Sequence, residues 1–229
     1  QSQKALEEKL SRQIGEVAYG YVLYVDDEPV AATDSYRLAV ADVAVEADEP
    51  YEPFQAIIPG RIFEDVAKMA SGYDAITIAF SENQVVFTFG ACIFVSRKIE
   101  GTYPNYKQLL PKDSACTITL PVAELISTVK RVSILAQAHT PVRFSFSAEE
   151  QKVTVSAKTQ DVGASRAALE AQVDGESMDI AFNHQYLLDG LQAVEGNVVI
   201  QLQSSLKPGT LRAEEDERFL YLAMPVRLG

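Results

Sequence analysis

The chain has 229 residues, of which 47% are hydrophobic and 23% are charged, and its formal net charge at pH 7 is −12. This composition is typical of a folded globular protein and excludes an intrinsically disordered chain. The length suggests two domains of about 100–150 residues each. The acidic balance excludes a simple basic nucleic-acid module, although an acidic protein can still carry one basic face.

The first half of the chain is expected to combine two helices with several strands. The helices are predicted at residues 4–17 and 59–70. The second of them begins at Pro59, a favoured first-turn residue, has apolar residues at helical spacing and should end at Gly72. Strands are predicted at residues 21–25, 36–45, 54–58, 75–80, 84–89 and 92–99.

The second half repeats this pattern after a segment with two prolines and no periodicity. Helices are predicted from Pro121 and over residues 183–194, the latter capped by Asn183. Strands are predicted at residues 116–119, 142–147, 152–157, 166–173, 178–182, 198–203, 210–212 and 219–224. We therefore expect domains at residues 1–103 and 113–229, joined by a linker at residues 104–112.

The two halves are expected to share one fold. Their second helices begin at Pro59 and Asn183, which lie 183 − 59 = 124 residues apart. Two helices with many antiparallel strands in each half predict an α+β fold, with the helices on one face of the sheets.

Several features are expected to exclude an enzyme, a metal site and a cofactor. The two histidines, His139 and His184, lie near no Cys or carboxylate cluster, and no catalytic or phosphate-binding motif is present. The acidic runs at residues 26–28 and 214–217 are interpreted as solvated turns. Asp34 is either a catalytic acid or the first residue of an Asx turn between two strands.

Cysteine content and hydropathy indicate the cellular compartment in which the protein is expected. Cys92 and Cys116 are too few for a disulfide framework and are interpreted as small buried hydrophobic residues in a reducing compartment. The polar N-terminus predicts no signal peptide. No apolar run approaches the roughly 18–20 residues that span a membrane, so no membrane partner is expected.

Three segments carry a family resemblance. Residues 32–39 read Ala-Thr-Asp-Ser-Tyr-Arg-Leu-Ala, residues 100–111 read Glu-Gly-Thr-Tyr-Pro-Asn-Tyr-Lys-Gln-Leu-Leu-Pro, and residues 221–228 read Tyr-Leu-Ala-Met-Pro-Val-Arg-Leu. In this order and spacing they resemble the middle-domain segment, the linker and the C-terminal tail of the bacterial DNA polymerase III beta subunit, the sliding clamp. The segment Asn183-x-x-Tyr186-Leu-Leu-Asp189 gives a fourth, looser match. The resemblance extends over residues 20–229.

The resemblance implies two repeated clamp domains from a three-domain chain of the bacterial cytoplasm. Such chains join head to tail into a ring around duplex DNA, with helices on the inner wall. Polymerase and clamp-loader subunits dock on the ring through short peptides that present a Gln and apolar side chains. Since the first domain is not in this sequence, the chain alone is expected to be a monomer or a weak oligomer that is not a ring. The alternative is an α+β small-molecule-binding or catalytic protein with an unrecognised site.

The resemblance also assigns residues to two sites. The implied peptide site lies between the two domains and comprises Thr33, Ser35, Tyr36, Arg37, Leu38, Pro104, Gln108, Leu109, Tyr186, Met224, Pro225, Val226, Arg227 and Leu228. The implied DNA-facing residues are Arg61, Lys68, Lys130 and Arg131. We expect Leu38→Asp to remove peptide binding by placing a charge in an apolar wall, and Met224→Ala to weaken binding while sparing the fold.

Overall fold

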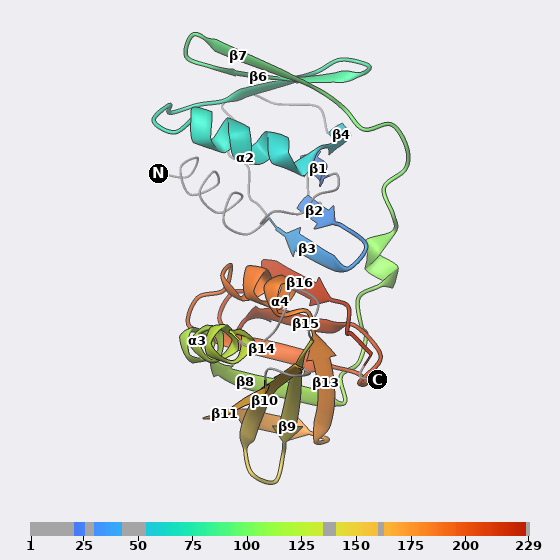
Figure 1. Ribbon diagram of the computed structural model, residues 1–229. Coiled ribbons are helices and arrows are strands. Elements are labelled where there is room, and N and C mark those ends of the chain that lie inside the picture. The colour runs from blue at the N-terminus through green and yellow to red at the C-terminus, as the bar shows by residue number, and fades with distance from the viewer. Residues whose placement is uncertain (1–20, 26–29, 43–53, 135–140, 160–162, 228–229) are drawn as a thin grey trace. The chain divides into compact units, whose positions relative to one another are not determined.

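The computed structural model divides the chain into two compact units, residues 1–105 and residues 106–229 (Figure 1). It describes residues 21–25, 30–42, 54–134, 141–159 and 163–227. The predicted helix at residues 4–17, the acidic run at residues 26–28, His139 and Leu228 lie outside these ranges. No helix in the described ranges is both long and apolar enough to cross a membrane.

Unit 1 contains seven strands and one helix in its described residues. They are β1 (Tyr21–Val25), β2 (Val30–Thr33), β3 (Arg37–Ala41), β4 (Phe54–Ile58), α2 (Gly60–Met69), β5 (Thr77–Phe80), β6 (Gln84–Phe89) and β7 (Cys92–Arg97). The strands pair antiparallel in the orders β3-β2-β1-β4 and β5-β6-β7.

Helix α2 begins where the sequence predicts, because Pro59 has the fixed φ of −57° that suits the residue before a helix. Its apolar side covers the three-stranded sheet: the rings of Phe63 and Phe87 meet edge to face at 6.0 Å between centroids. Val66 is buried in the same core cluster, so α2 is held to its sheet by apolar packing.

Unit 2 contains nine strands, two α-helices and one short 3-10 helix in its described residues. They are η1 (Tyr106–Gln108), β8 (Cys116–Pro121), α3 (Val122–Ser133), β9 (Val142–Ser147), β10 (Lys152–Thr159), β11 (Gly163–Glu170), β12 (Gln172–Gly175), β13 (Met178–Phe182), α4 (His184–Leu191), β14 (Asn197–Leu202), β15 (Gly209–Ala213) and β16 (Phe219–Ala223). Within this unit the strands pair in the orders β12-β8-β14-β15-β16 and β11-β10-β9-β13. Helix α3 packs against α4 and against strands of both sheets.

The strand orders of the two units repeat one plan. The order β3-β2-β1-β4 in unit 1 corresponds to β11-β10-β9-β13 in unit 2, and β5-β6-β7 corresponds to β14-β15-β16. In each unit a helix follows the last strand of the four-stranded arrangement: α2 follows β4, and α4 follows β13. The predicted α+β class is confirmed, and the topology supports the predicted internal repeat.

The structure and the predicted elements differ in several places. The short strand β2 was not predicted. Helix α4 ends at Leu191 and not at residue 194. The segment 166–173, predicted as one strand, is the end of β11 and the start of β12, separated at Ala171.

The break at Ala171 has a cause in a distant side chain. The Gln151 amide donates to the carbonyl of Val173 at 2.8 Å and accepts from its N–H at 3.0 Å. The Gln151 side chain thus occupies the hydrogen-bonding groups of Val173. The chain pairs with β10 through β11 and, after Ala171, with β8 through β12. No local pattern in residues 166–173 encodes this contact.

The two cysteines differ in exposure, so the interpretation of both as buried is wrong for Cys92. Cys116 is buried, and this burial, with the nearby carboxylates of Asp174 and Glu176, raises its pKa to about 11. We expect one thiol of the native protein to react readily with Ellman's reagent at pH 8 and the second only after unfolding in urea. Equal reaction of both thiols in the native protein would contradict this assignment.

The lowered pKa of Asp179 predicts that the free energy of unfolding of unit 2 decreases slightly in acid. A hydrogen bond from Ser145 and the guanidinium of Arg143, at 2.7 Å, lower the pKa of Asp179. A lowered pKa stabilises the folded state above the unfolded pKa of about 4, and this stabilisation is lost as the pH falls through the folded pKa. Because the pair is half-exposed, Asp179→Asn should cost less than about 1 kcal/mol at pH 7.

The measurement for Asp179 is urea unfolding of the parent and of Asp179→Asn at pH 7 and at a pH below the folded pKa. The difference in the free energy of unfolding should be present at pH 7 and vanish in acid. A difference that is the same at both pH values would contradict the linkage.

Candidate functional site

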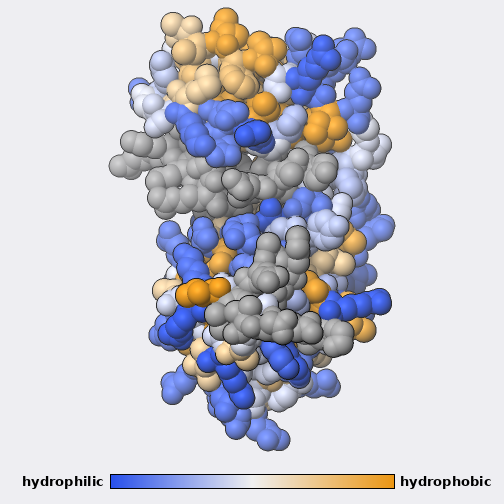
Figure 2. Space-filling view, viewed as in Figure 1, coloured by the Kyte–Doolittle hydropathy of each residue, from blue (hydrophilic) through white to orange (hydrophobic). Residues whose placement is uncertain are grey.

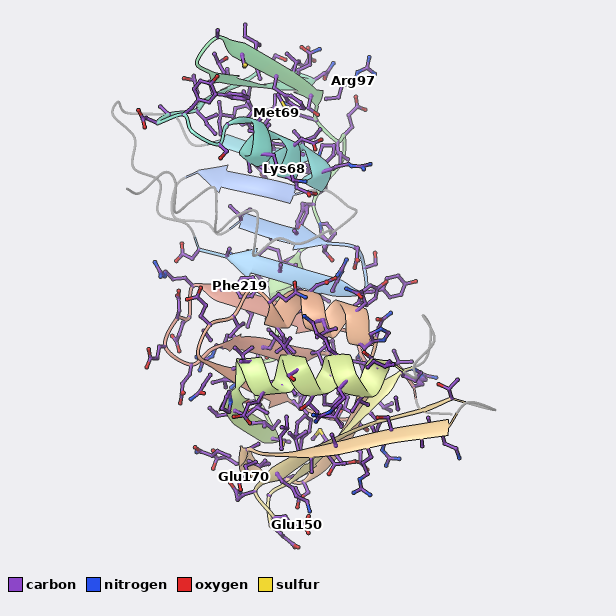
Figure 3. All side chains as sticks on the ribbon, turned by 60° about the vertical axis from the view of Figure 1, so that its left-hand side comes forward. Lys68, Met69, Arg97, Glu150, Glu170 and Phe219 are labelled. Atoms are coloured by element: carbon purple, nitrogen blue, oxygen red, sulfur yellow. The ribbon has the colours of Figure 1, made fainter. Side chains whose placement is uncertain are left out.

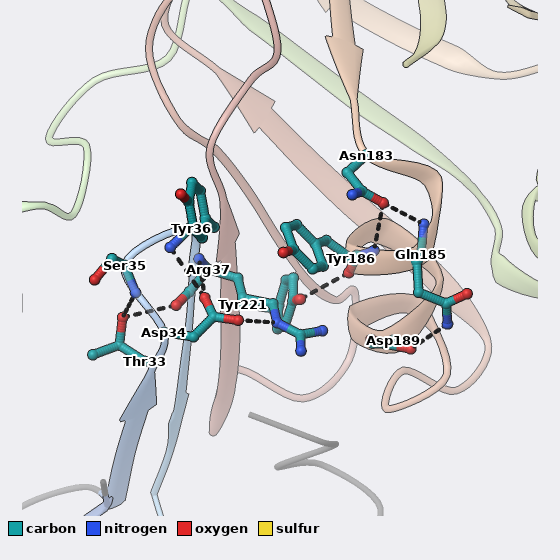
Figure 4. A network of polar contacts seen from close by, with 10 residues as sticks. All are labelled: Thr33, Asp34, Ser35, Tyr36, Arg37, Asn183, Gln185, Tyr186, Asp189 and Tyr221. Carbon is teal, nitrogen blue, oxygen red and sulfur yellow. Dashed lines mark hydrogen bonds and ion pairs between the residues drawn. The ribbon is translucent and has the colours of Figure 1, made fainter. Parts of the chain in front are cut away.

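The turn between β2 and β3 is built by Asp34 (Figure 4). Its Oδ1 accepts hydrogen bonds from the backbone N–H groups of Tyr36 and Arg37, both at 3.0 Å, which is Asx-turn geometry. Its Oδ2 accepts from Nε of Arg37 at 2.8 Å. Asp34 and Arg37 are 9% and 6% exposed, whereas Tyr36 is 61% exposed. The turn therefore buries its charges and presents the tyrosine.

Leu38 follows this turn as a core residue of β3. It is only 2% exposed and lies opposite Thr33 in the β2–β3 pair. A polar substitution of Leu38 is therefore expected to destabilise unit 1, whatever its effect on a binding site.

In unit 2 the first turn of α4 positions Tyr186 (Figure 4). The side chain of Asn183 accepts from the N–H groups of Gln185 and Tyr186, which confirms the predicted cap. The hydroxyl of Tyr221 donates to the carbonyl of Tyr186 at 2.7 Å. A Cβ at Gly190 would lie 2.5 Å from Cδ1 of Tyr221, so glycine lets α4 approach this ring closely.

The C-terminal tail is held beside the start of α4. The N–H of Val226 donates to the carbonyl of Ala181 in β13, two residues before Asn183. Met224, directly after β16, is 42% exposed, and Arg227 is also exposed. Pro225 and Val226 are half-buried. Unit 2 therefore brings the tail to the strand that leads into the helix carrying Tyr186.

The predicted linker contains the short helix η1. The N–H of Leu109 donates to the carbonyl of Tyr106 at 2.8 Å, and the side chain of Tyr106 is buried. Pro104, Gln108 and Leu109 are exposed. The segment is therefore locally ordered, and it presents one large apolar side chain, Leu109, at 56% exposure.

The four predicted DNA-facing residues are exposed on two helices. Arg61 and Lys68 lie seven residues apart, on one side of α2, and Figure 3 labels Lys68 at the end of this helix. Glu64 forms an ion pair with Lys68 and raises its pKa, so the positive charge of α2 is largely balanced. On α3, Lys130 is exposed, and Arg131 is exposed while its guanidinium lies 3.4 Å from Oγ1 of Thr128.

The structure also bears on the second acidic run and on the possible metal and small-molecule sites. The acidic run at residues 214–217 lies in the β15–β16 turn, where Asp216 pairs with Arg218 and Glu217 with Arg212. Within the described ranges, no three His, Cys, Asp or Glu residues gather to hold a metal ion. The apolar space beside Phe144, Phe182 and Leu187 measures about 10 Å³, no more than one water molecule needs. A small-molecule site in that core is not supported.

The two units match consecutive domains of one family. The family model described as the DNA polymerase III beta subunit, central domain, matches residues 21–105, and that of the C-terminal domain matches residues 107–227. The chain belongs to the DNA polymerase III beta subunit family. The resemblance inferred from three short motifs is thereby confirmed.

Relatives of this beta subunit family support the assignment along most of the chain. A beta sliding clamp of Synechococcus elongatus is 34% identical over 86% of this chain and 54% of its own length. One of Streptomyces coelicolor is 33% identical over 89% of this chain and 57% of its own length. The crystal structure of the DNA polymerase sliding clamp from Bacillus subtilis superposes with a TM-score of 0.87 and 26% identity, over 99% of this chain and 63% of that chain. The chain spans about half the length of the curated relatives it matches.

Two residues of this beta-subunit chain escaped the site assignment from sequence. Asp34 and Tyr221 both lie in segments that resemble the family, but the sequence assigns neither of them to the peptide site. The spacing Asp34-x-x-Arg37 is a signal for the first, because it allows one carboxylate to meet both the turn amides and a guanidinium. Tyr221 gave no such signal, since its partner lies 35 residues away.

Proposed function

We propose that this chain is the central and C-terminal part of a DNA sliding clamp, a non-catalytic ring that tethers polymerases to duplex DNA. The observation that carries the proposal is the succession of the two beta-subunit domains over residues 21–105 and 107–227. The repeated strand order of the two units supports it, because a ring of similar domains requires one plan used several times.

The charge distribution suits a ring that slides on DNA. Arg61 and Lys68 on α2 are accompanied by Glu64 and Asp65, while α3 adds Lys130 and Arg131 against Glu124. Phosphate contacts of this kind carry no sequence information and exchange along the duplex. A closed ring is retained by topology, so tight contacts would only slow its movement.

We expect weak and salt-dependent DNA binding by the isolated chain. Affinity for a labelled duplex should be no tighter than about 10⁻⁶ M at physiological salt. The double substitution of Lys130 and Arg131 by Ala should reduce the magnitude of the slope of log K against log salt concentration by about 2. Each lost phosphate contact removes about 0.9 from this slope. Fluorescence anisotropy over a salt series measures this slope. Nanomolar, salt-independent or sequence-specific binding would contradict the sliding account.

Self-association into a ring is supported by open sheet edges. Strand β11 ends one sheet of unit 2, and β7 ends the three-stranded sheet of unit 1, with no further strand beside either in the described residues. Ile93 and Val95 on β7 are 71% and 51% exposed, and Figure 2 shows apolar residues gathered over this end of unit 1. Open edges with apolar neighbours are templates for pairing with another domain.

The second part of the proposal is a peptide-docking site for polymerase and clamp-loader subunits. Its proposed members are Thr33, Ser35, Tyr36, Arg37, Leu38, Pro104, Gln108, Leu109, Tyr186 and the tail at residues 224–228. Of these, Arg37 and Leu38 are buried. Exposed Tyr36, Leu109 and Met224 supply apolar surface. Within unit 2 the bond between Val226 and Ala181 supports a shared position of the tail and α4.

The expected affinity for such a peptide is near micromolar. Two buried apolar side chains contribute roughly 1.5–3 kcal/mol each, and polar contacts roughly 0.5–1.5 kcal/mol each. The loss of freedom on binding offsets much of this, leaving about −8 kcal/mol. An affinity in this range lets different partners exchange on one clamp.

The test is fluorescence anisotropy with a labelled Gln-x-x-Leu-Phe peptide and a scrambled peptide of the same composition. We expect the first to bind in the micromolar range and the second at least about ten-fold more weakly. Equal binding of both peptides, or none of the first by the folded chain, would overturn the docking function.

A further inference from the structure

The turn at residues 33–37 is held in a conformation that its sequence does not favour. Ser35 has a φ of 73°, in the left-handed region that residues other than Gly, Asn and Asp rarely adopt. Such a conformation persists only where neighbouring contacts hold it. The contacts in question come from side chains on either side of Ser35.

Asp34 supplies most of these contacts (Figure 4). Its two oxygens accept three hydrogen bonds, from the N–H groups of Tyr36 and Arg37 and from Nε of Arg37. Oγ1 of Thr33 adds a bond to the carbonyl of Arg37 at 2.8 Å and accepts from the N–H of Ser35 at 3.3 Å. The backbone on both sides of Tyr36 is therefore fixed by groups that are largely buried.

Tyr36 differs from these groups because its side chain is 61% exposed. Asp34, at 9% exposure, is too deeply buried to serve as a contact surface, yet it sets the direction in which Tyr36 leaves the backbone. A side chain fixed before binding loses less conformational freedom on binding, so the same contact gives a higher affinity.

We propose that Asp34 is a positioning residue of the peptide site, holding the 33–37 turn so that Tyr36 is presented to a bound peptide. This inference rests on the proposed docking function. Asp34 acts through Tyr36 and through the order of the turn, and its own atoms make no contact with the peptide.

The experiment is a double-mutant cycle measured by anisotropy with the labelled Gln-x-x-Leu-Phe peptide. Tyr36→Ala should weaken binding roughly ten-fold, and Asp34→Ala should weaken it by a similar factor. If Asp34 acts through Tyr36, the double variant should bind no more than about two-fold more weakly than Tyr36→Ala. Asp34→Asn should fall between parent and Asp34→Ala, because its Oδ1 still accepts from the two backbone amides while the charge is lost.

Asp216→Asn is a matched control in the β15–β16 turn. Oδ1 of Asp216 accepts from the N–H and Nε of Arg218, at 3.0 and 2.8 Å, in a local Asp–Arg arrangement that is more exposed than that of Asp34. This variant should bind the peptide as the parent does. Hydrogen exchange of the Tyr36 and Arg37 amides should accelerate in Asp34→Ala and stay slow in Tyr36→Ala.

The outcomes separate this inference from the docking function. If Tyr36→Ala binds like the parent, Tyr36 is no part of the site and the site assignment fails. If Tyr36→Ala weakens binding but the Asp34 variants bind like the parent while their turn amides exchange faster, positioning by Asp34 is overturned. If the loss of affinity in the double variant equals the product of the two single losses, positioning by Asp34 is overturned as well. Should Asp34→Ala fail to fold, the same cycle with Asp34→Asn decides.

Discussion

Leu38→Asp should unfold unit 1. Leu38 is 2% exposed within β3, so its replacement removes a buried apolar side chain and introduces a carboxylate into the core. Truncation of a buried leucine alone costs about 2–5 kcal/mol, and the buried charge adds to this. The sum is a large part of the roughly 5–15 kcal/mol that stabilises a domain. The sequence-based expectation of lost peptide binding in a folded protein is therefore revised.

Urea unfolding followed by circular dichroism measures this effect. The transition of unit 1 should be absent or shifted to much lower urea, while that of unit 2 should remain. Leu38→Met, which keeps the volume of the side chain, is the matched control and should cost less than about 1.5 kcal/mol. A Leu38→Asp protein with the unfolding curve of the parent would show that Leu38 faces solvent.

Met224→Ala should weaken peptide binding ten-fold or more without a change in stability above about 1 kcal/mol. Met224 lies just beyond β16 and is 42% exposed, so the core of unit 2 depends little on it. Its flexible thioether suits an apolar peptide side chain, and burying such a residue contributes roughly 1.5–3 kcal/mol. That contribution corresponds to a ten-fold to hundred-fold change in Kd.

The control for Met224 is Ile134→Ala, because Ile134 is an exposed apolar residue at the end of α3 and belongs to no proposed peptide contact. Anisotropy should give parent-like affinity for Ile134→Ala and a clear loss for Met224→Ala. Equal affinities of Met224→Ala and the parent would remove the tail from the proposed site.

Most elements of the fold could be predicted from local patterns. Pro59 and Asn183 mark helix starts that the structure confirms, and alternation placed β6 and β9 at their observed bounds. Strand β2 was missed because two of its four residues are alanines, which favour strands weakly. The break between β11 and β12 depends on the side chain of Gln151, which is about twenty residues distant and invisible to a local pattern.

The candidate site was less predictable because its residues depend on tertiary contacts. The family motif identified the 33–38 turn, but it could not show that Arg37 and Leu38 are buried while Tyr36 is exposed. Only the geometry of the turn assigns these different surroundings to adjacent residues. The bond from Tyr221 to the Tyr186 carbonyl likewise joins residues 35 positions apart.

Hydrogen exchange with mass spectrometry in the presence of the Gln-x-x-Leu-Phe peptide tests the central claim most directly. We predict slower exchange in three separate segments on peptide binding: residues 33–38, residues 183–187 and residues 224–227. The scrambled peptide should change none of them, and the β9–β10 hairpin of unit 2 should be unaffected by either peptide. Protection confined to one segment, or protection elsewhere with these three unchanged, would contradict the proposed docking site.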